Sequence, residues 1–252
     1  MTNKVPEITL YFWIIKILAT TVGETAADYL SETLGLGLVV TTLVMGVALV
    51  AALAVQFGAR RYVPGVYWLA VVLLSIVGTL FTDNLVDNLG VALEVTTALF
   101  AVALAATFGT WYASERTLSI HTIVTSKREA FYWLAILFTF ALGTAAGDLV
   151  AETLAVGYWQ SALLFAAAIG FVTLSWRFLR VDAVLSFWAA YVLTRPLGAS
   201  IGDFLSQAPD DGGVGLGTTV TSALFLATIL LVVVYLGVTK LDHPKAPAPT
   251  DG

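Results

Sequence analysis

The sequence predicts an all-α, polytopic membrane protein with eight transmembrane helices, built from four parallel two-helix repeats. Composition is the first reason: 59% of the 252 residues are hydrophobic and 12% are charged, whereas soluble domains are about 45–50% apolar and about 25% charged. Apolar runs of the length that crosses a bilayer, about 20 residues, recur eight times. A fourfold internal repeat, described below, passes through these runs.

The eight apolar runs set the expected spans and units. The spans are expected near 7–29, 36–57, 64–86, 91–112, 129–151, 158–179, 183–206 and 217–239. The units are repeat 1 (1–60), repeat 2 (61–113), a central cytoplasmic loop (114–128), repeat 3 (129–180), repeat 4 (181–239) and a cytoplasmic tail (240–252). The tail is polar and rich in proline, a composition typical of disorder.

Basic residues predict the orientation of the chain. Ten of the twelve Lys and Arg residues lie in the termini or in alternate loops, and the other loops contain none. Because positively charged loops stay in the cytoplasm, both termini are expected there. The chain is therefore expected to be a multi-pass protein of the inner (cytoplasmic) membrane, with the lipid bilayer as its surroundings.

Four sets of residues mark the repeat. A tryptophan heads each odd-numbered span: Trp13, Trp68, Trp133 and Trp188. Ten residues later comes a glycine: Gly23, Gly78, Gly143 and Gly198. Fifteen residues after the tryptophan comes an aspartate: Asp28, Asp83, Asp148 and Asp203. The nineteenth position holds Glu32, Asp87, Glu152 and Gln207. Because every unit contains two spans, all four units enter the membrane in the same direction.

The chain resembles a known family at two stretches, TLSIHTI (117–123) and REAFYWLAILFTFALGTAAGDL (128–149). That family consists of bacterial membrane proteins of unknown function with four tandem two-helix repeats, each marked by a tryptophan. The resemblance covers essentially the whole chain apart from the tail. It implies eight spans and no established reaction, so it assigns no catalytic residue, and a role for His121 in the first stretch stays open.

The depth of each marked residue follows from the helical rise of about 1.5 Å per residue. The tryptophans are expected to be anchors at the cytoplasmic interface, where indole rings collect. The glycines then lie near the midplane and are expected to let helices pack closely, since small residues dominate membrane helix contacts. The aspartates lie in the outer leaflet, and the nineteenth positions lie at its edge.

The acidic residues form the candidate cation-binding set. Intramembrane acids normally face the bundle interior or a water-filled cavity, and four aspartates at one depth repel one another unless protons or cations hold them. The predicted set comprises Asp28, Asp83, Asp148, Asp203, Glu32, Asp87, Glu152 and Glu24, with the four aspartates as metal ligands. Polar termination of each span is the alternative explanation, above all for Glu32, Asp87 and Glu152.

Lys16 and Arg195 are the only basic residues within the expected spans. Each is expected to pair with an acid such as Glu24, or to act as an internal counter-cation. Lys16 has an alternative, because it is shallow enough to extend its amine to the interface.

Three function classes are compatible with these features. The leading hypothesis is a cation transporter or channel for Mn²⁺, Mg²⁺, Ca²⁺ or H⁺, because oxygen ligands without cysteine suit hard cations. A non-transporting sensor, scaffold or partner subunit is the alternative. An enzyme is not expected, because no nucleophile–base pair or phosphate-binding motif is visible. No cofactor other than a bound cation, and no nucleic acid, is expected; the oligomeric state is left open.

Overall fold

The computed structural model describes residues 3–244, and every regular element within them is helical. Eight α-helices carry the fold: α1 (Leu10–Asp28), α2 (Leu38–Gly58), α3 (Pro64–Asp83), α4 (Leu93–Glu115), α5 (Ser126–Asp148), α6 (Tyr158–Leu179), α7 (Ala183–Ser206) and α8 (Gly217–Thr239). The all-α class predicted from the sequence is confirmed. Six helices, α2, α3, α4, α5, α6 and α8, are long and apolar enough to cross a membrane.

The four odd-numbered helices form an inner ring. Neighbours pack around it in sequence order, α1 on α3, α3 on α5 and α5 on α7, and α7 closes the ring on α1. The inner helices α1 and α7 are not among the six apolar ones, and they carry Lys16, Glu24, Arg195 and Asp203. Surrounded by other helices, these charged side chains avoid lipid.

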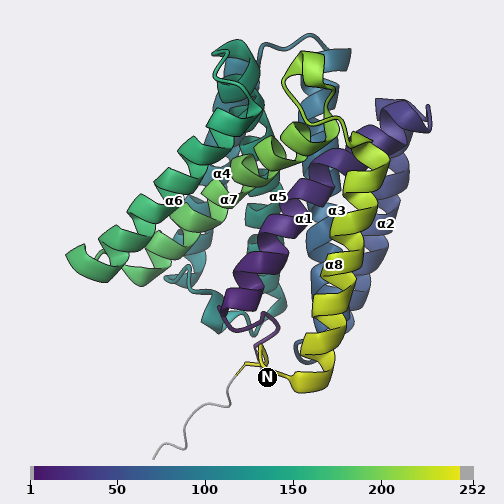
Figure 1. Ribbon diagram of the computed structural model, residues 1–252. Helices are drawn as coiled ribbons and strands as arrows, with labels where there is room; N and C mark the ends of the chain where they lie inside the picture. The colour runs from purple at the N-terminus through teal and green to yellow at the C-terminus, as the bar shows by residue number, and fades with distance from the viewer. Residues whose placement is uncertain (1–2, 245–252) are drawn as a thin grey trace, which may run out of the picture.

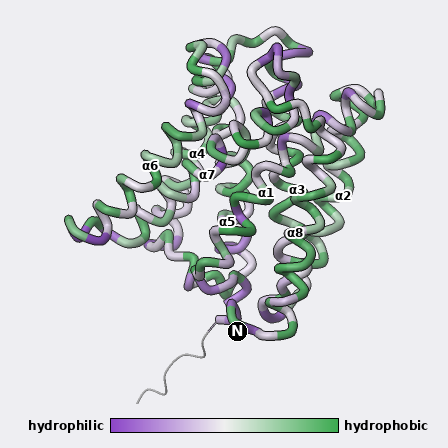
Figure 2. Tube along the Cα trace, in the orientation of Figure 1, coloured by the Kyte–Doolittle hydropathy of each residue, from purple (hydrophilic) through white to green (hydrophobic). Residues whose placement is uncertain are grey.

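The even-numbered helices form an outer layer with an offset pairing (Figure 1). Each packs on the inner helix of the following repeat: α2 on α3, α4 on α5, α6 on α7, and α8 on α1. The outer helices leave many large apolar side chains exposed, including Val47, Phe171 and Leu231. Hydrophobic residues follow the helices while hydrophilic ones gather toward their ends (Figure 2). Such a surface fits a bilayer, where apolar side chains are exposed to lipid.

The repeat glycines lie where neighbouring inner helices approach most closely. A Cβ atom added to any of them would come within 1.7–2.6 Å of a side chain on the next inner helix. The facing residues are Ser75 for Gly23, Phe140 for Gly78, Arg195 for Gly143, and Thr20 for Gly198. These four residues are themselves equivalent, each seven positions after a repeat tryptophan. The ring therefore has one contact repeated four times.

Both ends of the described chain lie at the same end of the bundle (Figure 1). The Lys4 amide donates to the Ile123 carbonyl, and the Glu7 amide donates to the Asp242 carbonyl. Asp242 is buried and accepts a hydrogen bond from Tyr62. The start of the expected disordered tail is thus packed against the bundle, and residues 245–252 lie outside the described part of the chain.

Candidate functional site

A pocket of about 200 Å³ opens at one end of the inner ring. All eight acidic residues of the predicted cation-binding set line it, and so does Gln207, the amide at the equivalent position of the fourth repeat. We call this pocket the acidic pocket and its end of the bundle the acidic end. The structure therefore brings together, around one axis, the residues that the repeat spacing singled out.

Burial of the acids follows their position in the repeat. Glu24 and Asp203 are buried, with 6% and 7% of their surface exposed. Asp28, Asp83 and Asp148 are half-buried, whereas Glu32, Asp87 and Glu152 are exposed at the rim. The acidic pocket thus runs from exposed acids at its rim to buried acids at its floor.

Three of the inner helices end in a π-helical turn that carries the rim acid. These turns are η1 (Tyr29–Thr33), η2 (Asn84–Asn88) and η4 (Leu149–Thr153), each starting directly after the repeat aspartate. The deep and the rim acid of each of these repeats both line the pocket. In the fourth repeat α7 stays α-helical to Ser206, and a 3₁₀ turn, η5 (Pro209–Asp211), follows. Such π-turns are frequent at functional sites, and no residue pattern in the sequence indicated them.

Arg195 lies directly beneath the floor of the acidic pocket and is fully buried. Its Nη2 lies 2.8 Å from Glu24 Oε2 and 2.6 Å from Thr144 Oγ1, and it also donates to the Thr79 hydroxyl. Its Nη1 and Nε donate to the carbonyls of Thr20 and Phe140. The expected pair between Arg195 and an acid such as Glu24 is present, and it spans α7 and α1.

Lys16 differs from the prediction. Its side chain is fully buried, so its amine does not reach the interface. Its Nζ lies 4.3 Å from the ring centroids of both Phe140 and Tyr191 and has no hydrogen-bond partner among the described residues. Pairing of Lys16 with an acid is therefore wrong: aromatic faces, which attract cations, surround it instead.

The repeat tryptophans also correct the prediction. Trp68, Trp133 and Trp188 are only 2–4% exposed, and Trp13 is partly buried. They pack with aromatic neighbours in the interior instead of facing the lipid interface: Trp68 and Trp133 both contact Tyr67, and Trp188 contacts Tyr191. Tyr132 is buried against Trp133 in the same way. We call this interior group the aromatic plug: Trp68, Trp133, Trp188, Tyr67, Tyr132 and Tyr191. Arg195, Lys16 and the aromatic plug fill the axis below the acidic pocket.

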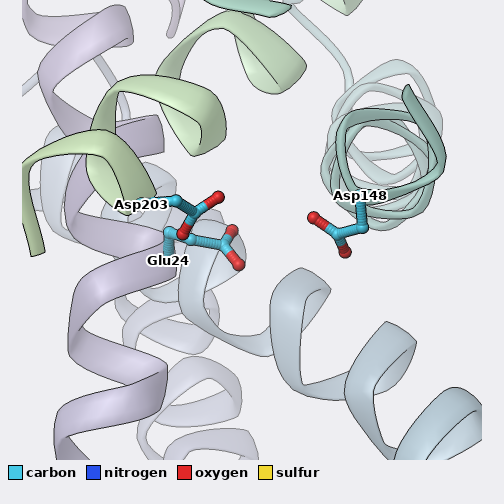
Figure 3. Close-up of side chains that lie close together, drawn as sticks. All are labelled: Glu24, Asp148 and Asp203. Carbon is cyan, nitrogen blue, oxygen red and sulfur yellow. The ribbon is translucent and has the colours of Figure 1, made fainter. Parts of the chain in front are cut away.

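Three acids at the floor are close enough to share a metal ion. One carboxylate oxygen each from Glu24, Asp148 and Asp203 lies within 4.8 Å of the others, and the three side chains point toward one another (Figure 3). The predicted metal set differed, since it held all four repeat aspartates. Asp28 and Asp83 line the same pocket but fall outside this close group, and Glu24 joins it instead.

The fold and the site define a repeat-built, multi-pass membrane protein with an acidic pocket at one end. Four copies of a repeat of unknown function (DUF347) match it, at residues 11–62, 66–117, 131–182 and 186–241. These matches cover most of the chain, so the protein belongs to this family, and the resemblance stated from its motifs is confirmed. No curated protein and no solved structure matches the chain.

Proposed function

We propose that this protein is a cation carrier of the inner membrane whose substrate enters the acidic pocket from the extracytoplasmic side. The observation that supports it is the convergence of eight carboxyl groups from four repeats on one pocket, with the guanidinium of Arg195 as the basic group at its floor. Uncompensated carboxylates repel one another strongly in a partly desolvated site. Protons or metal cations bound in the pocket would relieve that repulsion.

The proposed topology has eight spans with both termini in the cytoplasm. In this arrangement α1 and α7 cross inside the ring, where their charged residues are shielded from lipid by other helices. The basic loops, including Arg60, Arg116 and Arg180, then lie on the cytoplasmic side with the termini, as positively charged loops do. The acidic pocket consequently faces outward.

The ligand chemistry favours hard cations. Carboxylate, hydroxyl and carbonyl oxygens suit Mg²⁺, Mn²⁺ and Ca²⁺, and the chain contains no cysteine for softer metals. The proposed substrate is a divalent cation, Mn²⁺ or Mg²⁺, or else H⁺. A carrier is preferred to an open channel, because side chains fill the axis below the floor of the pocket.

Flux into proteoliposomes tests this proposal. Purified protein is reconstituted and assayed with Mn²⁺, Mg²⁺, Ca²⁺ and H⁺, beside a variant in which Asp28, Asp83, Asp148 and Asp203 are all replaced by Asn. We expect flux of at least one cation, and its loss in a variant that still elutes as a folded protein. The Asp210→Asn variant, which removes an exposed acid outside the pocket at the same end, is the matched control and should retain flux.

The packed axis also favours a second candidate, a non-transporting membrane sensor or partner subunit that binds cations without moving them. Binding to the acidic pocket with no flux from well-folded protein would support this candidate. Unchanged flux in the four-aspartate variant would refute a transport role for the pocket.

A further inference from the structure

The guanidinium of Arg195 occupies a cage of oxygen atoms at equivalent positions of the repeat. Eleven residues after each repeat tryptophan stand Glu24, Thr79, Thr144 and Ala199. Arg195 donates to the side chains of the three polar members of this set. It also donates to the main-chain carbonyls of Thr20 and Phe140, which are equivalent to Arg195 itself in repeats 1 and 3. One cation from α7 is thus bound by oxygens of α1, α3 and α5.

Such a cage consists of the groups that proteins use to bind hard cations: one carboxylate, two hydroxyls and two carbonyls. Here a covalently attached cation occupies it. Because the cage lies directly beneath the floor of the acidic pocket, a metal ion at that floor and the guanidinium would be close neighbours.

Glu24 belongs to both sites. Its Oε2 accepts from Arg195 at 2.8 Å, and a carboxylate oxygen of Glu24 also lies within 4.8 Å of oxygens of Asp148 and Asp203. Glu24 is therefore the one group for which the guanidinium and a metal ion at the floor compete.

Asp203 independently points to a ligand at the floor. Only 7% of the surface of Asp203 is exposed. The residue lines the pocket, and its carboxylate points toward Glu24 (Figure 3). Within residues 3–244 it has no hydrogen-bond or ion-pair partner for its side chain. A buried carboxylate without a partner is costly, and a bound cation would supply one.

We propose that Glu24, Asp148 and Asp203 form a divalent-cation site, and that Arg195 is a built-in competitor which the arriving cation displaces from Glu24. The proposal rests on the proposed function, because it assigns the cation site within the same pocket. Mn²⁺ and Mg²⁺ fit such a site, since they bind through a small number of carboxylates and keep several waters. Breaking the Arg195–Glu24 pair would remove one of the two hydrogen-bonded contacts of the Arg195 guanidinium with α1 and leave the one to the Thr20 carbonyl.

Mn²⁺ titration of the purified protein, followed by electron paramagnetic resonance, tests the assignment of the site. We expect Glu24→Gln and Asp203→Asn each to weaken binding by about tenfold or more, because each removes a charged ligand next to the metal. Asp83→Asn is the matched control: Asp83 is the repeat equivalent of Asp203 and lines the same pocket outside the close group. It should weaken binding much less.

The competitor role is tested by Arg195→Gln. Removing the guanidinium should tighten Mn²⁺ binding by about tenfold, because it removes a positive charge beside the metal and releases Glu24. Arg195→Lys keeps the charge and should stay close to the unmodified protein. The double variant Glu24→Gln/Arg195→Gln should lose most of the gain. If Arg195 merely supported the fold, its removal would weaken binding instead.

A reciprocal measurement serves if Arg195→Gln does not fold. Coupling between two ligands acts equally in both directions, so binding of diamagnetic Mg²⁺ must weaken the Arg195–Glu24 pair. In protein labelled with ¹⁵N-arginine, the Arg195 Nε resonance, assigned by its absence from Arg195→Lys, should shift on Mg²⁺ addition. An unmoved resonance under saturating Mg²⁺ would overturn the competition.

The outcomes separate the two proposals. Absence of binding of every tested cation to the unmodified protein would overturn the cation function and this site together. Binding that Asp83→Asn weakens as much as Glu24→Gln and Asp203→Asn do would leave the pocket's function intact and overturn the site. Binding that follows the expected ligand pattern, but is not tightened by Arg195→Gln, would overturn only the competitor role.

Discussion

The two ends of the inner ring are built from the same four helices, yet they are opposites. At the acidic end the helices surround a pocket lined by carboxyl groups from all four repeats. At the other end they bury the aromatic plug, in which Tyr67 and Tyr132 hydrogen-bond to each other between the tryptophans. The repeat is fourfold at both levels. A shared backbone arrangement therefore produces either a cavity or a closed core, according to the side chains that it directs inward.

The difference between the ends is one of volume and charge. Indole and phenol rings fill the axis and gain from tilted and edge-to-face contacts with one another. Carboxylates are small and repel one another, so they leave space. Between the two levels the symmetry breaks, since Arg195 and Lys16 have no basic equivalents in the other repeats. We expect stability to depend on the aromatic end and ligand binding on the acidic end.

The largest effect is expected from Trp68→Ala in the aromatic plug. Trp68 is 2% exposed and packs on Phe12 and Tyr67, so its truncation leaves a large cavity, and the free energy of unfolding should fall by about 3–5 kcal/mol. Denaturation in mixed micelles measures the change. Trp159→Ala on α6, where the side chain is half exposed, is the control. Equal losses in the two variants would contradict a stabilising aromatic core.

An intermediate effect is expected from Gly198→Ala in the inner ring. The added methyl group would lie 1.7 Å from Thr20 Oγ1 and 3.1 Å from the Thr21 amide nitrogen. The helices α7 and α1 must therefore separate, and such overpacking typically costs about 1–3 kcal/mol. The same denaturation assay measures it.

Gly170→Ala on the outer helix α6 provides the comparison, because a methyl group there meets nothing within 4 Å. This variant should be neutral or slightly more stable, since alanine favours helix over glycine. If Gly198→Ala proved as harmless as Gly170→Ala, close packing at the repeat glycines would not hold the ring together.

The common depth of the acids was predictable from the repeat period, whereas their convergence was not, because the spacing leaves open whether the four units surround one axis or pack as two pairs. Residues four apart lie on one helix face, and parallel repeats put equivalent residues at one level. Glu24 and Asp28 on α1 and Glu32 in η1 therefore had to follow one another along the chain's first inner helix and its final turn, and Asp83 and Asp148 had to lie level with Asp28. A ring of four inner helices is the arrangement in which all of them meet.

The direction in which each side chain points around its helix axis was not predictable from the same spacing. The position of Trp68 in the chain sets its depth, but the neighbours that decide whether its ring faces lipid or core lie on other helices. The same holds for the two basic residues. Arg195 meets Glu24 from 171 positions away in the chain, whereas Lys16, on the same helix as Glu24, lies between aromatic rings.

The smallest effect is expected from Tyr62→Phe, which tests how much one hydrogen bond at the aromatic end stabilises the fold. The Tyr62 hydroxyl donates to Asp242 Oδ2 at 2.5 Å and joins the segment after α8 to the α2–α3 connection. Loss of this bond should lower the free energy of unfolding by about 1 kcal/mol near neutral pH. Tyr112→Phe on α4, where the ring is 53% exposed, should leave it unchanged.

The pH dependence of that difference gives a sharper test of the same contact. Burial, with the hydrogen bond to Asp242, raises the pKa of Tyr62, so the folded state favours the protonated phenol. This contribution to stability is fully present below the unfolded-state pKa of about 10 and is lost as the pH rises above it. The unmodified protein should therefore lose its advantage over Tyr62→Phe between neutral pH and pH 11. A difference that stayed constant, or grew, over this range would show that the Tyr62 proton does not stabilise the fold, and that the aromatic end is held by ring packing alone.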